Sequence, residues 1–151
     1  MAKGAVKTPC IGVCSTGIGD RVCRGCKRFA HEVINWNSYT DAQKLLIEER
    51  LSQFLSQCTR NRLQVIDTGL LEKQLLSQQI RYPEQRDEYC WAYCLIKAGG
   101  SQIDDPGKYG LLVHPEYRSF SLSELRRLID EEFYVLSDAY YERYIGAAET
   151  A

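Results

Sequence analysis

The sequence has little that would direct the chain into a membrane or leave it unfolded. No run approaches the roughly 20 apolar residues that a membrane-spanning helix needs. The first ten residues, MAKGAVKTPC, lack an apolar stretch of signal-peptide length. Only 4 prolines occur among 151 residues, and 44% of the residues are hydrophobic, which excludes collagenous and disordered chains. We therefore expect a folded, cytoplasmic protein that does not bind membranes.

The common catalytic motifs are also missing. The sequence has no Gly-x-Ser-x-Gly, no phosphate-binding glycine loop and no dinucleotide fingerprint. The acidic run 130–132 occupies consecutive positions of a predicted helix, so its carboxylates point in different directions and predict a solvated face. The pair in Cys23-Arg24-Gly25-Cys26 resembles a redox motif, but it follows no predicted strand, which disfavours a thiol oxidoreductase. No catalytic residue is predicted, and we expect a protein without enzymatic activity.

Cysteine, by contrast, is abundant, with seven residues of which four fall within seventeen positions. Cytosolic thiols stay reduced, so such a cluster indicates metal binding more than disulfides. The spacing Cys-x3-Cys-x8-Cys-x2-Cys provides two short pairs joined by a glycine-bearing loop, as a tetrahedral four-thiolate site requires. Basic neighbours would lower the pKa values of these thiols. The predicted metal ligands are Cys10, Cys14, Cys23 and Cys26.

The spacing does not decide between a zinc ion and an iron-sulfur cluster, because thiolate sets bind both. A closed set of four ligands leaves no open coordination position for a substrate, which favours a structural centre. His31 lies five residues after Cys26, and with four cysteines available we expect it to support the site rather than to ligate.

Charge is unevenly distributed. Residues 1–30 contain six Lys and Arg residues and one Asp, a net charge of +5, whereas the remainder carries a net charge of −6. Such a basic segment could contact an anion or a nucleic acid. However, the segment lacks the interleaved aromatics that single-strand readers use, so nucleic-acid binding ranks third among our hypotheses. The predicted anion contacts are Arg21, Arg24, Lys27 and Arg28.

Hydrophobic periodicity predicts helices after the cysteine segment. Thr40 with Gln43, and Ser121 with Glu124, have the spacing of capping boxes that begin long helices. The predicted helices cover residues 28–36, 40–62, 68–80, 84–98 and 121–145. Residues 111–113 are predicted as a short strand or a core plug. The fold class is therefore mainly α: a loop-built four-cysteine knuckle and a body of four or five helices.

Two regions follow from this pattern. Residues 1–60 form a predicted metal-binding module with its long helix, and residues 61–151 form a helical region of unknown role, with one compact unit also possible. We expect three further cysteines to pack in the core, with a second thiol site as the alternative: Cys58 on the long helix, and Cys90 and Cys94 in the second region. Nine of the ten tyrosines follow residue 80. We expect them to pack along amphipathic helices, and a surface that binds a protein partner is the alternative.

The cysteine segment also resembles a known family. The pairs Pro9-Cys10-x3-Cys14 and Cys23-Arg24-Gly25-Cys26, followed by Asn35-Trp36 and the helix start at Thr40, are similar over residues 9–55 to the bacterial domain of unknown function 1289. Its members are described as predicted iron-sulfur or cysteine-motif proteins. The resemblance implies the same four ligands and favours an iron-sulfur cluster, but it implies no activity and leaves residues 61–151 unexplained.

Together these observations predict a small metal-binding protein with a structural metal module and a protein partner. The alternative is an iron-sulfur protein for electron transfer or redox sensing, built on the same four cysteines.

Overall fold

The computed structural model describes residues 8, 9, 11 and 14–146. Its contacts divide the chain into two compact units. We call Met1–Phe54 with Phe133–Ala151 the cysteine unit, and Leu55–Glu132 the helical unit. The sequence predicts two regions divided at residue 60, and this division stays a prediction. The cysteine unit differs from the predicted first region because it also includes residues 133–151.

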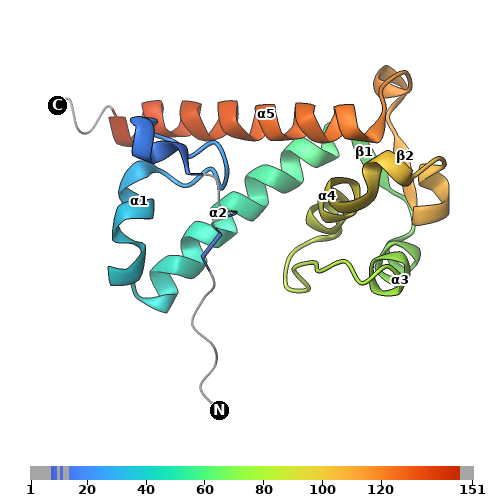
Figure 1. The fold of residues 1–151 in the computed structure, drawn as a ribbon, viewed down its shortest axis with the longest axis horizontal. Helices are drawn as coiled ribbons and strands as arrows, with labels where there is room; N and C mark the ends of the chain where they lie inside the picture. The colour runs from blue at the N-terminus through green and yellow to red at the C-terminus, as the bar shows by residue number, and fades with distance from the viewer. Residues whose placement is uncertain (1–7, 10, 12–13, 147–151) are drawn as a thin grey trace, which may run out of the picture. The chain divides into compact units, whose positions relative to one another are not determined.

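The cysteine unit combines irregular loops with parts of three helices (Figure 1). A 3₁₀ turn, Ser15–Ile18, precedes the loop that carries the second cysteine pair. Helix α1 (Ala30–Asn35) follows, and the unit also holds the first part of α2 (Asp41–Arg60) and the second part of α5 (Leu122–Tyr141). Its buried apolar residues are Val22, Phe29, Trp36, Ile47, Leu51 and Phe133.

The predicted capping box at Thr40 is complete, whereas at Ser121 only the bond to the hydroxyl oxygen is formed and Glu124 Oε1 accepts the Ser121 hydroxyl. The Thr40 N–H donates to Gln43 Oε1 at 2.8 Å, and the Gln43 N–H donates to Thr40 Oγ1 at 3.2 Å. At the start of α5 the Glu124 N–H donates to Ser121 Oγ at 3.1 Å. These bonds satisfy amide groups that have no partner within the helix, so the sequence could locate both helix starts.

The helical unit packs α3 (Thr68–Ser77) against α4 (Glu88–Gly99) beside a two-stranded antiparallel sheet. Strand β1 (Leu63–Val65) pairs with β2 (Leu111–Val113). The first part of α5 belongs to this unit. Its core is mainly aliphatic, and the fully buried leucines and isoleucines are Leu63, Leu71, Leu75, Leu95, Ile96, Leu111, Leu125 and Ile129.

One local prediction needs correction, and one strand was missed. The fourth helix begins at Glu88 instead of Glu84, because the Asp87 carboxylate accepts the N–H groups of Tyr89 and Cys90 and so caps the helix there. Strand β1 was not predicted, since three residues are too short to show a period and their partner lies nearly fifty residues away. Residues 111–113 form the predicted strand.

Gly110 fixes the entry into β2. Its φ is +77°, and a Cβ at this position would lie 2.3 Å from the Asp67 carbonyl oxygen. That carbonyl belongs to the residue whose side chain caps α3 by accepting the Leu70 N–H at 3.0 Å. A glycine is required here because any side chain at position 110 would collide with the backbone of Asp67.

The mainly α class with five α-helices in the described residues is confirmed. Within those residues no helix is long and apolar enough to span a membrane.

Candidate metal centre

Three of the four predicted ligands lie close together at the start of the cysteine unit. Cys14 is exposed and its Sγ lies 3.0 Å from Thr16 Oγ1. Cys23 and Cys26 are buried, with exposed fractions of 1% and 8%. Cys10 lies outside the described residues. The arrangement brings Cys14 close to the second pair.

The second pair is held by a tight turn, residues 23–28, which we call the thiol turn. The Lys27 N–H donates to the Cys23 carbonyl at 2.8 Å, and the Cys23 N–H donates to the Arg28 carbonyl at 2.8 Å. An isolated β-bridge between Val22 and Phe29 closes the base of the turn. These bonds fold the chain back so that both thiols face the same side of one loop.

Backbone amides of this turn point at the sulfur atoms. Cys23 Sγ accepts N–H groups from Gly25, Cys26 and Ser15, and Cys26 Sγ accepts the N–H of Arg28. The Arg28 side chain adds a further bond from Nε to Cys26 Sγ at 3.2 Å. Donors aimed at sulfur stabilise the thiolate, which is the form that binds metals.

These contacts set the pKa values of the two thiols apart. Burial raises the pKa of Cys23, but the amide donors outweigh it and lower the pKa to about 7. Burial also raises the pKa of Cys26, and the bonds from Arg28 offset only part of this effect. The charge of a Cys23 thiolate adds a smaller contribution that also raises the pKa of Cys26.

Ser15 links the first pair to the second. Its Oγ accepts the Arg24 N–H at 2.8 Å, while its own N–H donates to Cys23 Sγ. These two bonds of Ser15 therefore hold Cys14, the preceding residue, close to the thiol turn. Among the described residues, from which Cys10 is absent, no group of three or more Cys, His, Asp and Glu side chains meets the geometry of a metal site.

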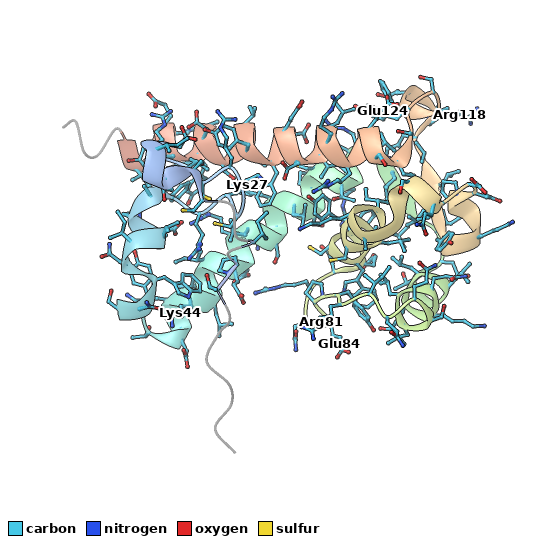
Figure 2. All side chains as sticks on the ribbon, viewed as in Figure 1. Lys27, Lys44, Arg81, Glu84, Arg118 and Glu124 are labelled. Atoms are coloured by element: carbon cyan, nitrogen blue, oxygen red, sulfur yellow. The ribbon has the colours of Figure 1, made fainter. Side chains whose placement is uncertain are left out.

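Lys27 occupies an unusual position in the thiol turn. Its φ is +65°, a region that favours glycine, and its side chain is only 1% exposed. Figure 2 labels this lysine. The ammonium donates to the carbonyls of Arg24 and Gly25, and it lies 5.4 Å from the centre of the Phe133 ring. The lysine thus closes the turn from inside, which compensates for its strained backbone.

The four basic residues predicted as anion contacts are largely engaged within the unit. Arg21 binds Asp138 at 2.9 and 3.1 Å and Glu142 at 2.6 Å. Lys27 and Arg28 are buried, and the Arg28 guanidinium lies 4.9 Å from the centre of the Trp36 ring. Only the Arg24 side chain is mostly exposed, at 65%. This placement leaves little free positive charge for an external anion.

Aromatic residues of α5 attach the helix to the cysteine segment. Tyr140 stacks on Phe29 with ring centres 6.0 Å apart, and Tyr141 meets the same ring edge-on at 5.3 Å. Arg24 lies 4.4 Å from the centre of the Tyr134 ring. The tyrosine-rich helix therefore packs within the unit, which agrees with the predicted amphipathic packing.

A buried ion pair supports the same ring of Phe29. Glu32, 5% exposed, accepts two bonds of 2.7 Å from the guanidinium of Arg50, which lies 4.1 Å from the Phe29 ring centre. Glu32 also accepts the Phe29 N–H at 2.9 Å. The pair was not predicted, although the three-residue separation of Phe29 and Glu32 is that of a capping box. His31 packs near this ring at 5.8 Å.

The other three cysteines belong to the helical unit. Cys58 and Cys90 are 0% and 2% exposed, in agreement with core packing. Burial and the carboxylate of Glu132 raise the pKa of Cys58 to about 12. Burial raises the pKa of Cys90 to about 12 and also raises that of Cys94. All three stay protonated thiols near neutral pH, unlike Cys23.

Comparison with known proteins identifies the same segment. Residues 8–55 match a family described as a protein of unknown function, DUF1289. The match confirms the resemblance over the cysteine segment and stops at the position where α2 leaves the cysteine unit. No curated protein and no solved structure matches the chain. The DUF1289 segment therefore contains all four predicted ligands, whereas the aromatic residues of α5 that contact it lie outside the match.

Proposed function

We propose that the protein binds one metal centre through Cys10, Cys14, Cys23 and Cys26, and that this centre has a structural role. The observation that carries the proposal is the thiol turn, in which backbone amides are already directed at Cys23 Sγ and Cys26 Sγ. A loop without these donors would have to reorganise when a metal binds. A preorganised loop lowers the free energy of that step.

The charges around the site fit this donor set. Four thiolates exceed the charge of a zinc ion and leave the centre negative, so buried cations beside it are favourable. Lys27 and Arg28 provide two such cations, and Arg28 donates directly to Cys26 Sγ. The bound centre would supply cross-links among loops that otherwise have little regular structure.

An iron-sulfur protein for electron transfer or redox sensing is the second candidate. Hydrogen bonds to the ligating sulfurs are one of the factors that set the potential of such a cluster. The amide bonds to Cys23 Sγ therefore support this candidate as well as the zinc centre. Nucleic-acid binding is less well supported, because all four of its predicted contacts are buried or already paired with a carboxylate.

The experiment that tests the proposal is metal analysis of freshly and anaerobically purified full-length protein, together with an absorption spectrum. Colourless protein with one equivalent of zinc supports the structural centre. Brown protein that bleaches reversibly upon reduction supports the iron-sulfur alternative. Protein without either metal contradicts the proposal.

Matched variants locate the centre. We expect Cys23→Ser and Cys26→Ser to lose most of the bound metal, because each removes a thiolate ligand. Cys94→Ser removes a partly exposed thiol from the helical unit and should leave the metal content unchanged. Equal metal content in all three variants would place the metal elsewhere.

The remaining part of the proposed function is a protein partner. The features that favour one lie in the helical unit.

A further inference from the structure

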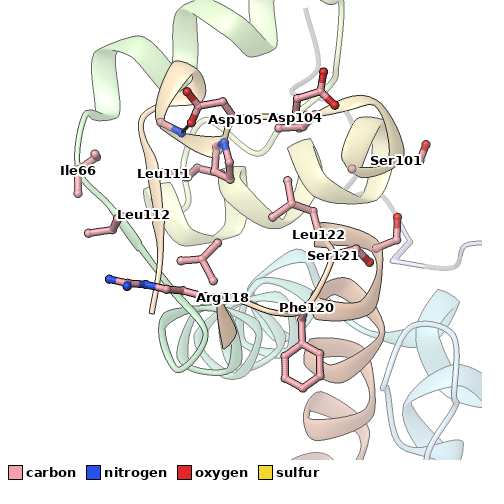
Figure 3. Close-up of a pocket in the computed structure, with 16 residues that line it drawn as sticks. Ile66, Ser101, Asp104, Asp105, Leu111, Leu112, Arg118, Phe120, Ser121 and Leu122 are labelled. Atoms are coloured by element: carbon pink, nitrogen blue, oxygen red, sulfur yellow. Dashed lines mark hydrogen bonds between the residues drawn. The ribbon is translucent and has the colours of Figure 1, made fainter. Parts of the chain in front are cut away.

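An open groove lies along strand β2 of the helical unit (Figure 3). Its volume is about 500 Å³, and its lining comes from the segments 100–107, 111–113 and 118–123 together with Ile66. All of these residues belong to the helical unit. The groove is therefore separate from the cysteine site.

The pairing of the two strands shows which backbone groups of β2 face away from β1. The Ile66 N–H donates to the Gly110 carbonyl at 2.8 Å, and the His114 N–H donates to the Arg62 carbonyl at 3.0 Å. In an antiparallel pair, residues facing the partner strand alternate with residues facing away. On β2, the backbone N–H and carbonyl of Leu112 therefore face β1. The backbone groups of Leu111 and Val113 point away from β1, toward the outer edge of the sheet.

The two outer edges of the sheet differ. On β1 the outward N–H of Val65 donates to the hydroxyl of Tyr89 at 3.4 Å. On β2, Leu111 is only 1% exposed, but Val113 is half-buried and lines the groove. Within the described part of the chain, the outward N–H and carbonyl of Val113 have no hydrogen-bond partner. An unpaired strand edge is a template for another strand.

Apolar side chains surround this edge. Ile66, Leu112 and Phe120 are 54%, 51% and 39% exposed. Leu122 projects into the middle of the groove in Figure 3. A strand that paired with β2 would place alternate side chains on opposite faces of the sheet, against these apolar residues.

Charged groups mark the two ends of the groove. Arg118 lies toward one end and Asp104 and Asp105 toward the other (Figure 3). The Arg118 guanidinium has no hydrogen-bond or ion-pair partner among the residues that the structure describes. Its charge is thus available to an acidic group of a ligand, and the aspartates disfavour such a group at the opposite end.

We propose that this groove binds an extended segment of a partner protein, which pairs with the outer edge of β2 as a third strand. The segment carries apolar side chains at alternate positions and an acidic side chain at the end that meets Arg118. A peptide fits because it offers both an acceptor for the Val113 N–H and a donor for its carbonyl. This proposal goes beyond the metal centre and does not depend on it.

The test uses a phage-displayed library of random heptapeptides, selected on immobilised full-length protein. We expect enriched peptides with alternating apolar residues and an acidic residue at one end. The peptides are then synthesised, and their affinity is measured by calorimetry against the protein and its variants. N-methylation of alternate peptide amides should weaken binding only at the positions that face β2.

Val113→Pro is the decisive variant, because proline removes the outward N–H of the strand edge without removing a bond to β1. We expect about tenfold weaker binding, since one peptide carbonyl loses its donor. Arg118→Glu lies in an exposed loop and should weaken binding about tenfold as well. Arg127→Glu, an exposed charge change outside the groove, is the control and should bind normally.

Three results would overturn the proposal. The first is a selection that enriches no sequence, and the second is an enriched peptide that binds both variants as tightly as the unchanged protein. The third is a concentration-dependent dimer, seen by light scattering, that Val113→Pro abolishes; it would assign the edge to a second copy of this chain. If Val113→Pro fails to fold, the affinities of Arg118→Glu and of the N-methylated peptides still test whether the segment binds at the edge of β2.

Discussion

The two units of this protein are stabilised by different interactions. The helical unit buries leucines and isoleucines, several of them completely. The cysteine unit buries ions among its apolar residues: Lys27, Arg28 and Glu32 are 1%, 3% and 5% exposed. Burial of apolar surface stabilises a fold without added groups, whereas buried ions do so only when their partners are correctly placed. The comparison predicts that the cysteine unit depends more than the helical unit on the proposed metal centre.

Metal removal should give the largest difference between the units. Binding to a structural site contributes on the order of 10 kcal/mol, which exceeds the stability of most small domains. We expect chelation to remove hydrogen-exchange protection from α1 and from the α5 residues that contact the cysteine segment, while α3 and α4 keep theirs. Equal loss of protection in both units would contradict the comparison.

In the helical unit a core truncation should have the next largest effect. Leu95→Ala removes a completely buried side chain and leaves a cavity. We expect a loss of about 4 kcal/mol in the free energy of unfolding, measured by urea denaturation. Leu76→Ala, at a position that is 61% exposed in α3, is the control and should cost less than about 1 kcal/mol.

In the cysteine unit the buried ion pair should be the most sensitive charged contact. Arg50→Ala leaves the Glu32 carboxylate buried without its cation, and we expect a loss of about 3 kcal/mol. Arg24→Ala breaks an exposed pair with Asp20 and should cost less than about 1 kcal/mol. Denaturation of both variants with metal present checks the difference, and equal losses would mean that burial is unimportant here.

Backbone geometry at Gly110 should matter less than these contacts. Gly110→Ala places a methyl group against the Asp67 carbonyl at a positive φ, with an expected cost of about 2 kcal/mol. Gly69→Ala provides the control, since its Cβ would meet the nearest atom at an ordinary 3.6 Å. Thermal denaturation should separate the two variants, and equal melting temperatures would show that the loop can move aside.

Acid should produce the smallest effect and act on both units. Hydrogen bonds from Arg21 lower the pKa of Asp138 in the cysteine unit. In the helical unit burial opposes the shift, but bonds from Asn61, Arg62 and Cys58 still lower the pKa of Glu132.

A lowered folded-state pKa contributes stability that is complete above the unfolded value and is lost as the pH falls through the folded value. The ordinary values are 3.8 for Asp138 and 4.5 for Glu132. We therefore expect each group to contribute under about 1 kcal/mol above pH 5, lost progressively below pH 4.5, because both carboxylates are partly exposed. Urea titrations of Asp138→Asn and Glu132→Gln should show a weaker pH dependence than the unchanged protein.

Much of the fold was predictable because its signals are local. The capping boxes at Thr40 and Ser121 begin α2 and α5, and the apolar period continues each helix from there. The pair spacing around Cys23 and Cys26 predicts a turn, and a turn is present. By contrast, β1 and the contact of Arg21 with Asp138 join residues far apart in sequence, for which one sequence carries no local signal.

The sequence by itself determined the helices and the clustering of cysteines, since periodicity, caps and short spacings act between neighbours. Only the tertiary structure decided that Lys27 and Arg28 are buried and that Arg21 and Arg24 are paired with carboxylates, which leaves these four residues little free positive charge. It also decided that β2 keeps an open edge. Both outcomes depend on which distant segment covers a given side chain or strand, and burial and pairing are settled only when the chain has folded.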